Sequence, residues 1–75
     1  MRDKLAQVMA SSLGITAEEA RMAAFKDTKG WDSVGHVNLM NAIEEAFDVS
    51  LEADDILDFK SYLRGVEILE RYGIV

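Results

Sequence analysis

Apolar residues recur along the chain at spacings of three and four, and no strictly alternating stretch persists. This periodicity is typical of amphipathic helices, so it predicts an all-α bundle. The first segment predicts a helix of roughly residues 2–12, and Gly14 can end it in the left-handed conformation. The apolar positions of this helix are Leu5, Val8, Met9 and Leu13.

The stretch that follows contains a second helix-start signal. Thr16 and Glu19 have the spacing of a capping box, which predicts a short helical turn through Ala20 and Met22. Residues 26–30 are polar and end in glycine, so they are expected to form a loop.

The next helix is the best-defined element of the pattern. Asp32 or Ser33 can cap it, and its helix-forming residues continue to about Phe47. Trp31, just before the cap, is expected to act as a hydrophobic staple that packs back against the first turns. Its core face is expected to carry Gly35, Leu39, Ala42, Ile43 and Ala46. Val37 and Met40 fall on another stripe, in line with the serine. They either form an exposed docking surface or pack under the loop of residues 15–31.

The last third of the chain predicts two more helical segments. Residues 53–57 suit one short turn, and Ser61 can cap a last helix that ends near Tyr72. The expected core stripe of that helix is Leu63, Val66, Ile68 or Leu69, and Tyr72. The predicted architecture is therefore three main helices with one short helix before the last. Residues 1–75 are expected to form a single domain, because a chain this short has no apolar residues for a second core.

The charge balance narrows the classes of partner. Eight basic and fourteen acidic side chains give a net charge of −6, which argues against nucleic acid and favours basic protein partners. Residues 31–75 alone carry −7, a surplus that could also serve only solubility. No stretch is apolar enough for a signal peptide or membrane insertion, so we expect a cytoplasmic protein. We also expect it to be a monomer. The absence of cysteine excludes thiolate metal sites.

A motif opens the best-defined helix. The run WDSVGHV at residues 31–37, followed by AIEEAFD at residues 42–48, resembles the signature of acyl carrier proteins. In that family Asp-Ser-Leu opens the second helix and Leu-Glu-Glu-x-Phe closes it. The resemblance covers nearly the whole chain and implies a free-standing carrier with an acyl-carrier-like bundle.

The resemblance implies that Ser33 is the attachment point of 4′-phosphopantetheine, transferred from coenzyme A by a separate magnesium-dependent phosphopantetheinyl transferase. A helix N-terminus suits a phosphodiester, and the thiol of the arm would explain a carrier that lacks cysteine. Asp32 is expected to help the transferase position magnesium and the coenzyme, and His36 is a candidate contact for the phosphate. The alternatives are helix caps for Asp32 and Ser33 and a partly exposed helix residue for His36.

The same resemblance predicts a face that docks on acyl-transferring or condensing enzymes with basic patches. Its expected members are Val34, Val37, Met40, Glu44, Glu45, Asp48, Asp54 and Asp55. Gly35 and Asn38 stand where the common fatty-acid type has acidic residues, which favours a specialised carrier of polyketide or related pathways. An unmodified interaction domain of the same fold is the alternative. An enzyme is disfavoured, because one histidine and no cysteine give no convergent catalytic set.

Overall fold

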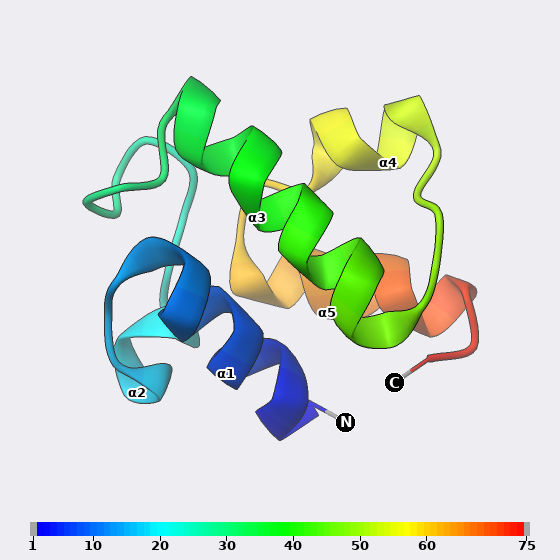
Figure 1. Ribbon diagram of the computed structural model, residues 1–75, viewed down its shortest axis with the longest axis horizontal. Helices are drawn as coiled ribbons and strands as arrows, with labels where there is room; N and C mark the ends of the chain where they lie inside the picture. Colours follow the sequence, from blue (N-terminus) through cyan, green and yellow to red (C-terminus); the bar gives the residue numbers. More distant parts are fainter. Residues whose placement is uncertain (1, 75) are drawn as a thin grey trace.

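The computed structural model describes residues 2–74 of the chain, with the side chain of Arg2 left out, and that part consists of helices joined by loops (Figure 1). The helices are α1 (Arg2–Leu13), α2 (Ala17–Ala20), α3 (Ser33–Phe47), α4 (Ala53–Asp58) and α5 (Tyr62–Arg71). The predicted all-α class is confirmed, with three long helices and a short one before the last. The assignment of residues 1–75 to one domain stays a prediction, and Met1 and Val75 lie outside the described residues.

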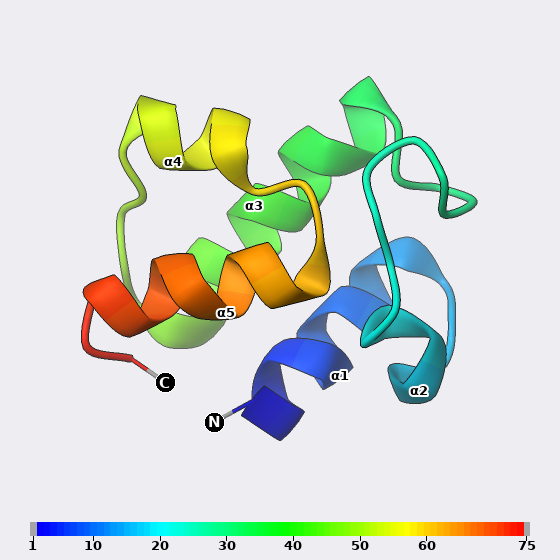
Figure 2. The same cartoon turned by 180° about the vertical axis from the view of Figure 1, so that it is seen from behind.

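α3 connects the two ends of the molecule. α1 packs against α2 and α3, and α3 crosses in front of α5 in Figure 1. α4 lies beside α5, at the end of the molecule away from α1 and α2, as both views show (Figures 1 and 2). The loop between α2 and α3 runs along the molecule to the start of α3. The first turn of α3 therefore lies between this loop and α4.

Local signals set the helix ends where the sequence predicts them. α1 ends at Gly14, which adopts φ +73°. Thr16 accepts a hydrogen bond from the backbone N–H of Glu19, and the Glu19 carboxylate accepts one from Thr16, so the capping box is confirmed. Ser61 caps α5 by accepting from the backbone N–H of Arg64. Each of these ends depends on residues close in sequence.

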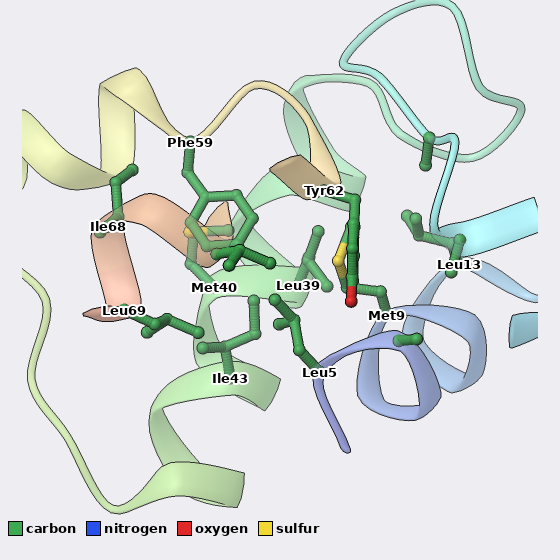
Figure 3. Packing of buried hydrophobic residues seen from close by; sticks show 14 of the residues in the cluster. Leu5, Met9, Leu13, Leu39, Met40, Ile43, Phe59, Tyr62, Ile68 and Leu69 are labelled. Atoms are coloured by element: carbon green, nitrogen blue, oxygen red, sulfur yellow. The ribbon is translucent and has the colours of Figure 1, made fainter. Parts of the chain in front are cut away.

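One apolar core joins the long helices (Figure 3). α3 contributes Leu39 and Ile43, both fully buried, as its predicted core face requires. α1 contributes Leu5, Met9 and Leu13, and α5 contributes Tyr62, Val66, Ile68 and Leu69. The prediction that Leu63 belongs to this core is wrong, because its side chain is 70% exposed. Tyr62 takes that place, and the next residue points about 100° away from the buried stripe.

Phe59 fills the space between α4 and α5. Its ring is fully buried, and a Cβ atom added at Gly65 would lie 2.2 Å from it. α5 therefore needs a residue without a side chain at that position, so that the aromatic ring can lie against its backbone.

Candidate functional site

The start of α3 is capped by Asp32. This residue has an extended backbone, and its Oδ1 atom accepts a hydrogen bond of 2.8 Å from the backbone N–H of Gly35. Ser33 follows as the first helical residue, and its side chain is exposed. Asp32 is therefore the cap of α3, and the hydroxyl of Ser33 is not used for capping.

The surroundings of Ser33 suit a phosphodiester. The first N–H groups of a helix have no partner within the helix, and the aligned peptide dipoles make this end positive. α3 is fifteen residues long. A phosphate ester on Ser33 would lie against these N–H groups, so the residues present fit a phosphopantetheine arm. Among the described residues, no three His, Cys, Asp or Glu side chains are grouped so as to hold a metal ion.

Trp31 and His36 anchor the first turn of α3. Trp31 is fully buried, and its indole N–H donates to Nδ1 of His36 over 2.9 Å. The two ring planes are nearly parallel, with an interplanar angle of 14°. Because the residues flank the Asp32 cap at the positions of a hydrophobic staple, the predicted staple is confirmed.

The second ring nitrogen of His36 connects α3 to α4. Since Nδ1 accepts from the indole, the ring proton belongs on Nε2, which donates to the carbonyl oxygen of Ile56 over 2.7 Å. The side chain is half-buried, as one alternative expected. Contact between His36 and a phosphate on Ser33 would require one of these two hydrogen bonds to break.

Gly35 lets the preceding loop approach α3 closely. A Cβ atom at this position would lie only 1.9 Å from the carbonyl oxygen of Gly30, which itself adopts φ +87°. No side chain fits there without moving backbone. The common fatty-acid type has an acidic residue at this position, and such a side chain would collide with the loop here. Nothing in the local sequence indicates this steric restriction.

Part of the predicted docking face is exposed. Val34 and Val37 are 72% and 58% exposed, so they form an apolar strip along α3 beside Ser33. Glu45, Asp48 and Asp54 are also exposed. These five side chains are therefore open to solvent, and their role in docking stays a prediction.

Met40 does not lie on that face. Its side chain is only 3% exposed and belongs to the core cluster, so the expectation that it awaits a partner is wrong. The helical periodicity places Met40 on a different stripe from Leu39 and Ile43. The buried sector of α3 is nevertheless wide enough to include Met40. Figure 3 shows Met40 among the core residues, below Phe59.

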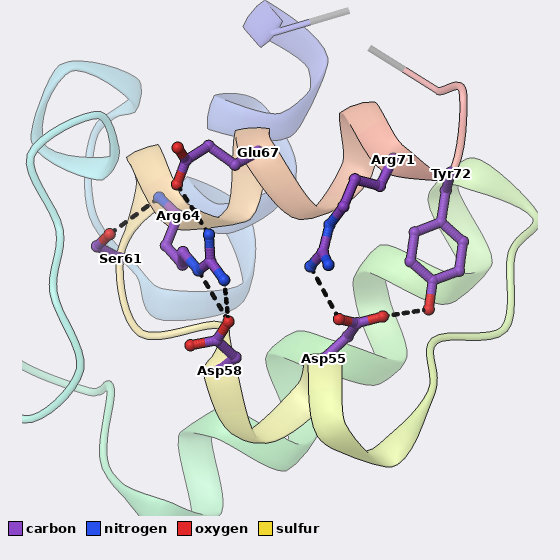
Figure 4. A network of polar contacts seen from close by, with 7 residues as sticks. All are labelled: Asp55, Asp58, Ser61, Arg64, Glu67, Arg71 and Tyr72. Carbon is purple, nitrogen blue, oxygen red and sulfur yellow. Dashed lines mark hydrogen bonds and ion pairs between the residues drawn. The ribbon is translucent and has the colours of Figure 1, made fainter.

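Two carboxylates of the predicted docking face form hydrogen bonds within the protein. Glu44 is half-buried, and its Oε2 atom accepts from the backbone N–H of Leu51 over 2.7 Å. The side chain of Asp55 is 18% exposed. It accepts from Arg71 over 3.0 Å and from the hydroxyl of Tyr72 over 2.6 Å (Figure 4). Both are therefore less available to a partner than the sequence suggests.

Polar contacts also hold the end of α4. Asp58 accepts from Nε of Arg64 over 2.9 Å, and a second guanidinium nitrogen contacts the same carboxylate oxygen (Figure 4). The hydrogen bond from Arg64 holds the pKa of Asp58 below its ordinary value. The hydrogen bond to Asp55 raises the pKa of Tyr72. Sequence reasoning missed both pairings, because partners 6 and 17 residues apart, on either side of the α4–α5 connection, leave no local pattern.

The chain was compared with known proteins. The model of the family "Phosphopantetheine attachment site" matches residues 3–64. The acyl carrier protein of Clostridium perfringens (strain 13 / Type A) is 32% identical over 73 residues, which cover 96% of each chain. That of Clostridium acetobutylicum is 37% identical over 54 residues, covering 71% of this chain and 70% of the relative.

A third acyl carrier protein, from Nitratidesulfovibrio vulgaris, is 32% identical over 56 residues, covering 73% of this chain and 74% of the relative. No solved structure matches the chain. In the part of the chain that the structure describes, each helix is too short or too polar to cross a bilayer.

Proposed function

The chain belongs to the phosphopantetheine-binding acyl carrier proteins, and from this premise we propose that Ser33 is the residue that carries the arm. Proteins of this family hold acyl groups on covalent 4′-phosphopantetheine and are carriers, not enzymes, and this chain is such a carrier. The observation that supports Ser33 is its position: an exposed hydroxyl on the first residue of α3, with the cap supplied by its neighbour.

The residues around Ser33 have separate parts in loading. Its Oγ atom forms the new bond to the phosphorus next to pantetheine, the anhydride bond of coenzyme A breaks, adenosine 3′,5′-bisphosphate leaves, and the serine proton passes to a base on the transferase. Asp32 caps the helix and presents a second carboxylate oxygen toward the transferase and its magnesium ion. The attached arm supplies a thiol that holds acyl groups as thioesters. His36 keeps Trp31 and α4 in place beside this site.

The docking face that we propose is smaller than the one the sequence predicts. It consists of Val34 and Val37 beside Ser33, of Glu45 and Asp48 at the other end of α3, and of Asp54 in α4. Exposed apolar groups on a helix that also carries exposed carboxylates suit partners that combine apolar and basic groups. We propose that these partners are a phosphopantetheinyl transferase and cytoplasmic acyl-transferring or condensing enzymes of fatty-acid, polyketide or related biosynthesis, met by a monomeric carrier.

Intact mass tests the attachment site. Incubation with coenzyme A, magnesium and a broad-specificity transferase is expected to add one phosphopantetheine to the chain. Ser33→Ala should abolish the gain, because no other hydroxyl starts α3. Ser50→Ala is the matched control, since Ser50 is exposed but lies outside the helices; this variant should load fully.

Two results would contradict the proposal. A mass gain on Ser33→Ala would place the arm on another residue. If the unaltered chain gained no mass with any transferase, while its helical circular dichroism stayed intact, the unmodified interaction domain would be the better account.

A further inference from the structure

An open groove lies between α5, the start of α1 and the end of α2. It has a volume of about 820 Å³, and Tyr62, Leu63 and Val66 of α5 form its apolar floor. Of the described residues that line it, none belongs to α3 or α4. Figure 2 shows the molecule with α5 in front of α3 and the first turns of α1 beside α5. The groove is therefore separate from the proposed docking face, whose members all come from α3 and α4.

Two exposed apolar side chains belong to this side of the molecule. Leu63 is 70% exposed and Met22 is 81% exposed. The backbone N–H of Tyr62 donates to the carbonyl oxygen of Ala23 over 3.2 Å. Met22 precedes one partner of this hydrogen bond and Leu63 follows the other, so their backbones are neighbours. Neither side chain is part of the core or of the proposed docking face, and neighbouring exposed apolar groups indicate an interaction site.

Acidic side chains surround the apolar floor. Asp3, Glu67 and Glu70 line the groove and are exposed, and Arg21 is the one basic residue among its described lining residues. Arg21 is paired with Asp3 over 2.7 Å. Arg64, which contacts Glu67, also pairs with a carboxylate of α4. Three carboxylates against one guanidinium leave the lining with two negative charges, which favours a basic ligand.

The groove side of α5 carries its apolar and acidic groups in one line. Leu63, Glu67 and Glu70 are four and three residues apart, so they lie on one side of the helix over about 10 Å. A second helix laid along this line can place an apolar residue against Leu63 and basic residues against the two glutamates. Amphipathic helices bind in grooves through such spacings.

A second copy of this chain is a poor occupant. Joining two copies through their grooves would bring six carboxylates and two guanidinium groups together. Like charges facing each other across an interface oppose association. The net charge of −6 on each copy adds repulsion at longer range. The charge therefore points to a basic molecule of another kind.

We propose that this groove is a second docking surface, which binds a basic amphipathic helix of a partner protein. The apolar side of that helix would cover Met22 and Leu63, and its lysines or arginines would face Glu67 and Glu70. Because no residue of α3 lines the groove, a partner bound there leaves Ser33 open. The chain can then stay attached to one protein while other proteins reach the start of α3. This inference holds whether or not the arm is attached at Ser33.

Nuclear magnetic resonance with a model peptide tests the inference. The probe is an amphipathic helical peptide of leucine and lysine, and its counterpart has glutamate in place of every lysine. The lysine peptide is expected to shift the methyl signals of Met22 and Leu63 in the unmodified chain, whereas the glutamate peptide is not. Leu63→Ser should weaken binding of the lysine peptide about tenfold, because the burial of a leucine side chain is lost.

Leu57→Ser is the matched control for this substitution. Leu57 is 71% exposed, nearly the same as Leu63, but it lies in α4. This variant should bind the lysine peptide with unaltered affinity. Intact mass gives a second readout: with the peptide bound, the unaltered chain should be loaded at Ser33 at its unaltered rate, because the groove and the proposed docking face share no residue.

Four results would overturn the inference. Two of them are equal binding of both peptides and equal weakening by Leu57→Ser and Leu63→Ser. If Val37→Ser weakened binding and Leu63→Ser did not, the peptide would lie on the α3 face, and slower loading with the peptide bound would likewise show that the two surfaces overlap. Leu63 methyl shifts that depend on protein concentration, without any peptide, would assign the groove to a second copy and would also contradict the proposal.

Discussion

Asp32 closes the first turn of α3 by accepting the backbone N–H of Gly35, and it also precedes the residue that we expect to be modified. Capping requires a side-chain oxygen atom that accepts a hydrogen bond, whereas positioning magnesium requires the negative charge of the carboxylate. Asparagine keeps the first property and removes the second, so the two tasks are separable.

Asp32→Asn is expected to leave the free energy of unfolding nearly unchanged and to lower the rate of phosphopantetheine loading. Asp32→Ala should lower the rate as well and should also lower the free energy of unfolding by about 1 kcal/mol, because the cap is lost. Urea unfolding and time-resolved intact mass measure the two quantities.

Ser61→Ala is the matched control for this pair. It removes the side-chain cap of α5 and should therefore cost a similar free energy of unfolding, but it lies away from the start of α3 and should load at the unaltered rate. Loading of Asp32→Asn at the unaltered rate would show that the carboxylate acts only as a cap.

At the scale of single residues, sequence reasoning succeeded where partners are close in the chain. The caps at Thr16 and Ser61 and the staple at Trp31 follow from spacings of three to five residues. The need for glycine at position 35 could not be predicted, since it comes from a loop carbonyl whose path depends on the folded chain.

Among the helices, α4 is held mainly by polar contacts. None of its six residues is buried. Asp55 and Asp58 bind the arginines of α5, and His36 donates to the carbonyl oxygen of Ile56. A helix with little buried apolar surface contributes little to the core, so we expect α4 to open more readily than α3 or α5.

The same polar contacts explain why the acidic face was predicted too large. The run of carboxylates in residues 54–58 indicates charge, but the sequence does not indicate which carboxylates meet a cation from another helix. Asp54 projects outward, while Asp55, its neighbour, turns toward Arg71 and Tyr72. The composition predicted the sign of this surface, and only the fold determines its members.

The contact between Tyr72 and Asp55 makes the attachment of α4 to α5 sensitive to alkaline pH. Since the hydrogen bond to Asp55 raises the pKa of Tyr72, the contact stabilises the fold below the ordinary tyrosine pKa of about 10. That stabilisation is lost as the pH rises through the higher pKa of the folded state, where two anions would face each other.

Asp55→Asn is expected to lower the titration midpoint of Tyr72, because the negative charge that opposes ionisation is removed. Residue-resolved carbon-13 shifts of labelled tyrosine measure this midpoint. Asp54→Asn removes a neighbouring exposed charge and should change it much less. An equal effect of the two substitutions would contradict the specific contact.

At the scale of the whole molecule, the periodicity of apolar residues was sufficient to predict three long helices and their order. It failed for Leu63 and Met40, because it cannot tell how wide the buried sector of a helix becomes once its neighbours are in place. The distribution of charge is the other global feature. The surplus of acidic residues begins near residue 30, and the part of the chain that follows contains the proposed docking face.

If the acidic surplus guides partners to this face, reversing charges there should slow association more than reversing the same number elsewhere. Glu45→Lys combined with Asp48→Lys changes two exposed carboxylates at the end of α3. We expect the association rate constant with a basic phosphopantetheinyl transferase to fall about tenfold at low salt, because electrostatic steering is lost. Its dependence on ionic strength should weaken accordingly.

Glu18→Lys combined with Asp27→Lys is the matched control, since it produces the same net charge at exposed positions of the first thirty residues. Stopped-flow fluorescence over a range of salt concentrations compares the two double variants. The control should stay within about twofold of the unaltered protein at low salt, because neither residue belongs to the docking face. Equal slowing in both would mean that net charge, and not a local acidic face, governs the encounter.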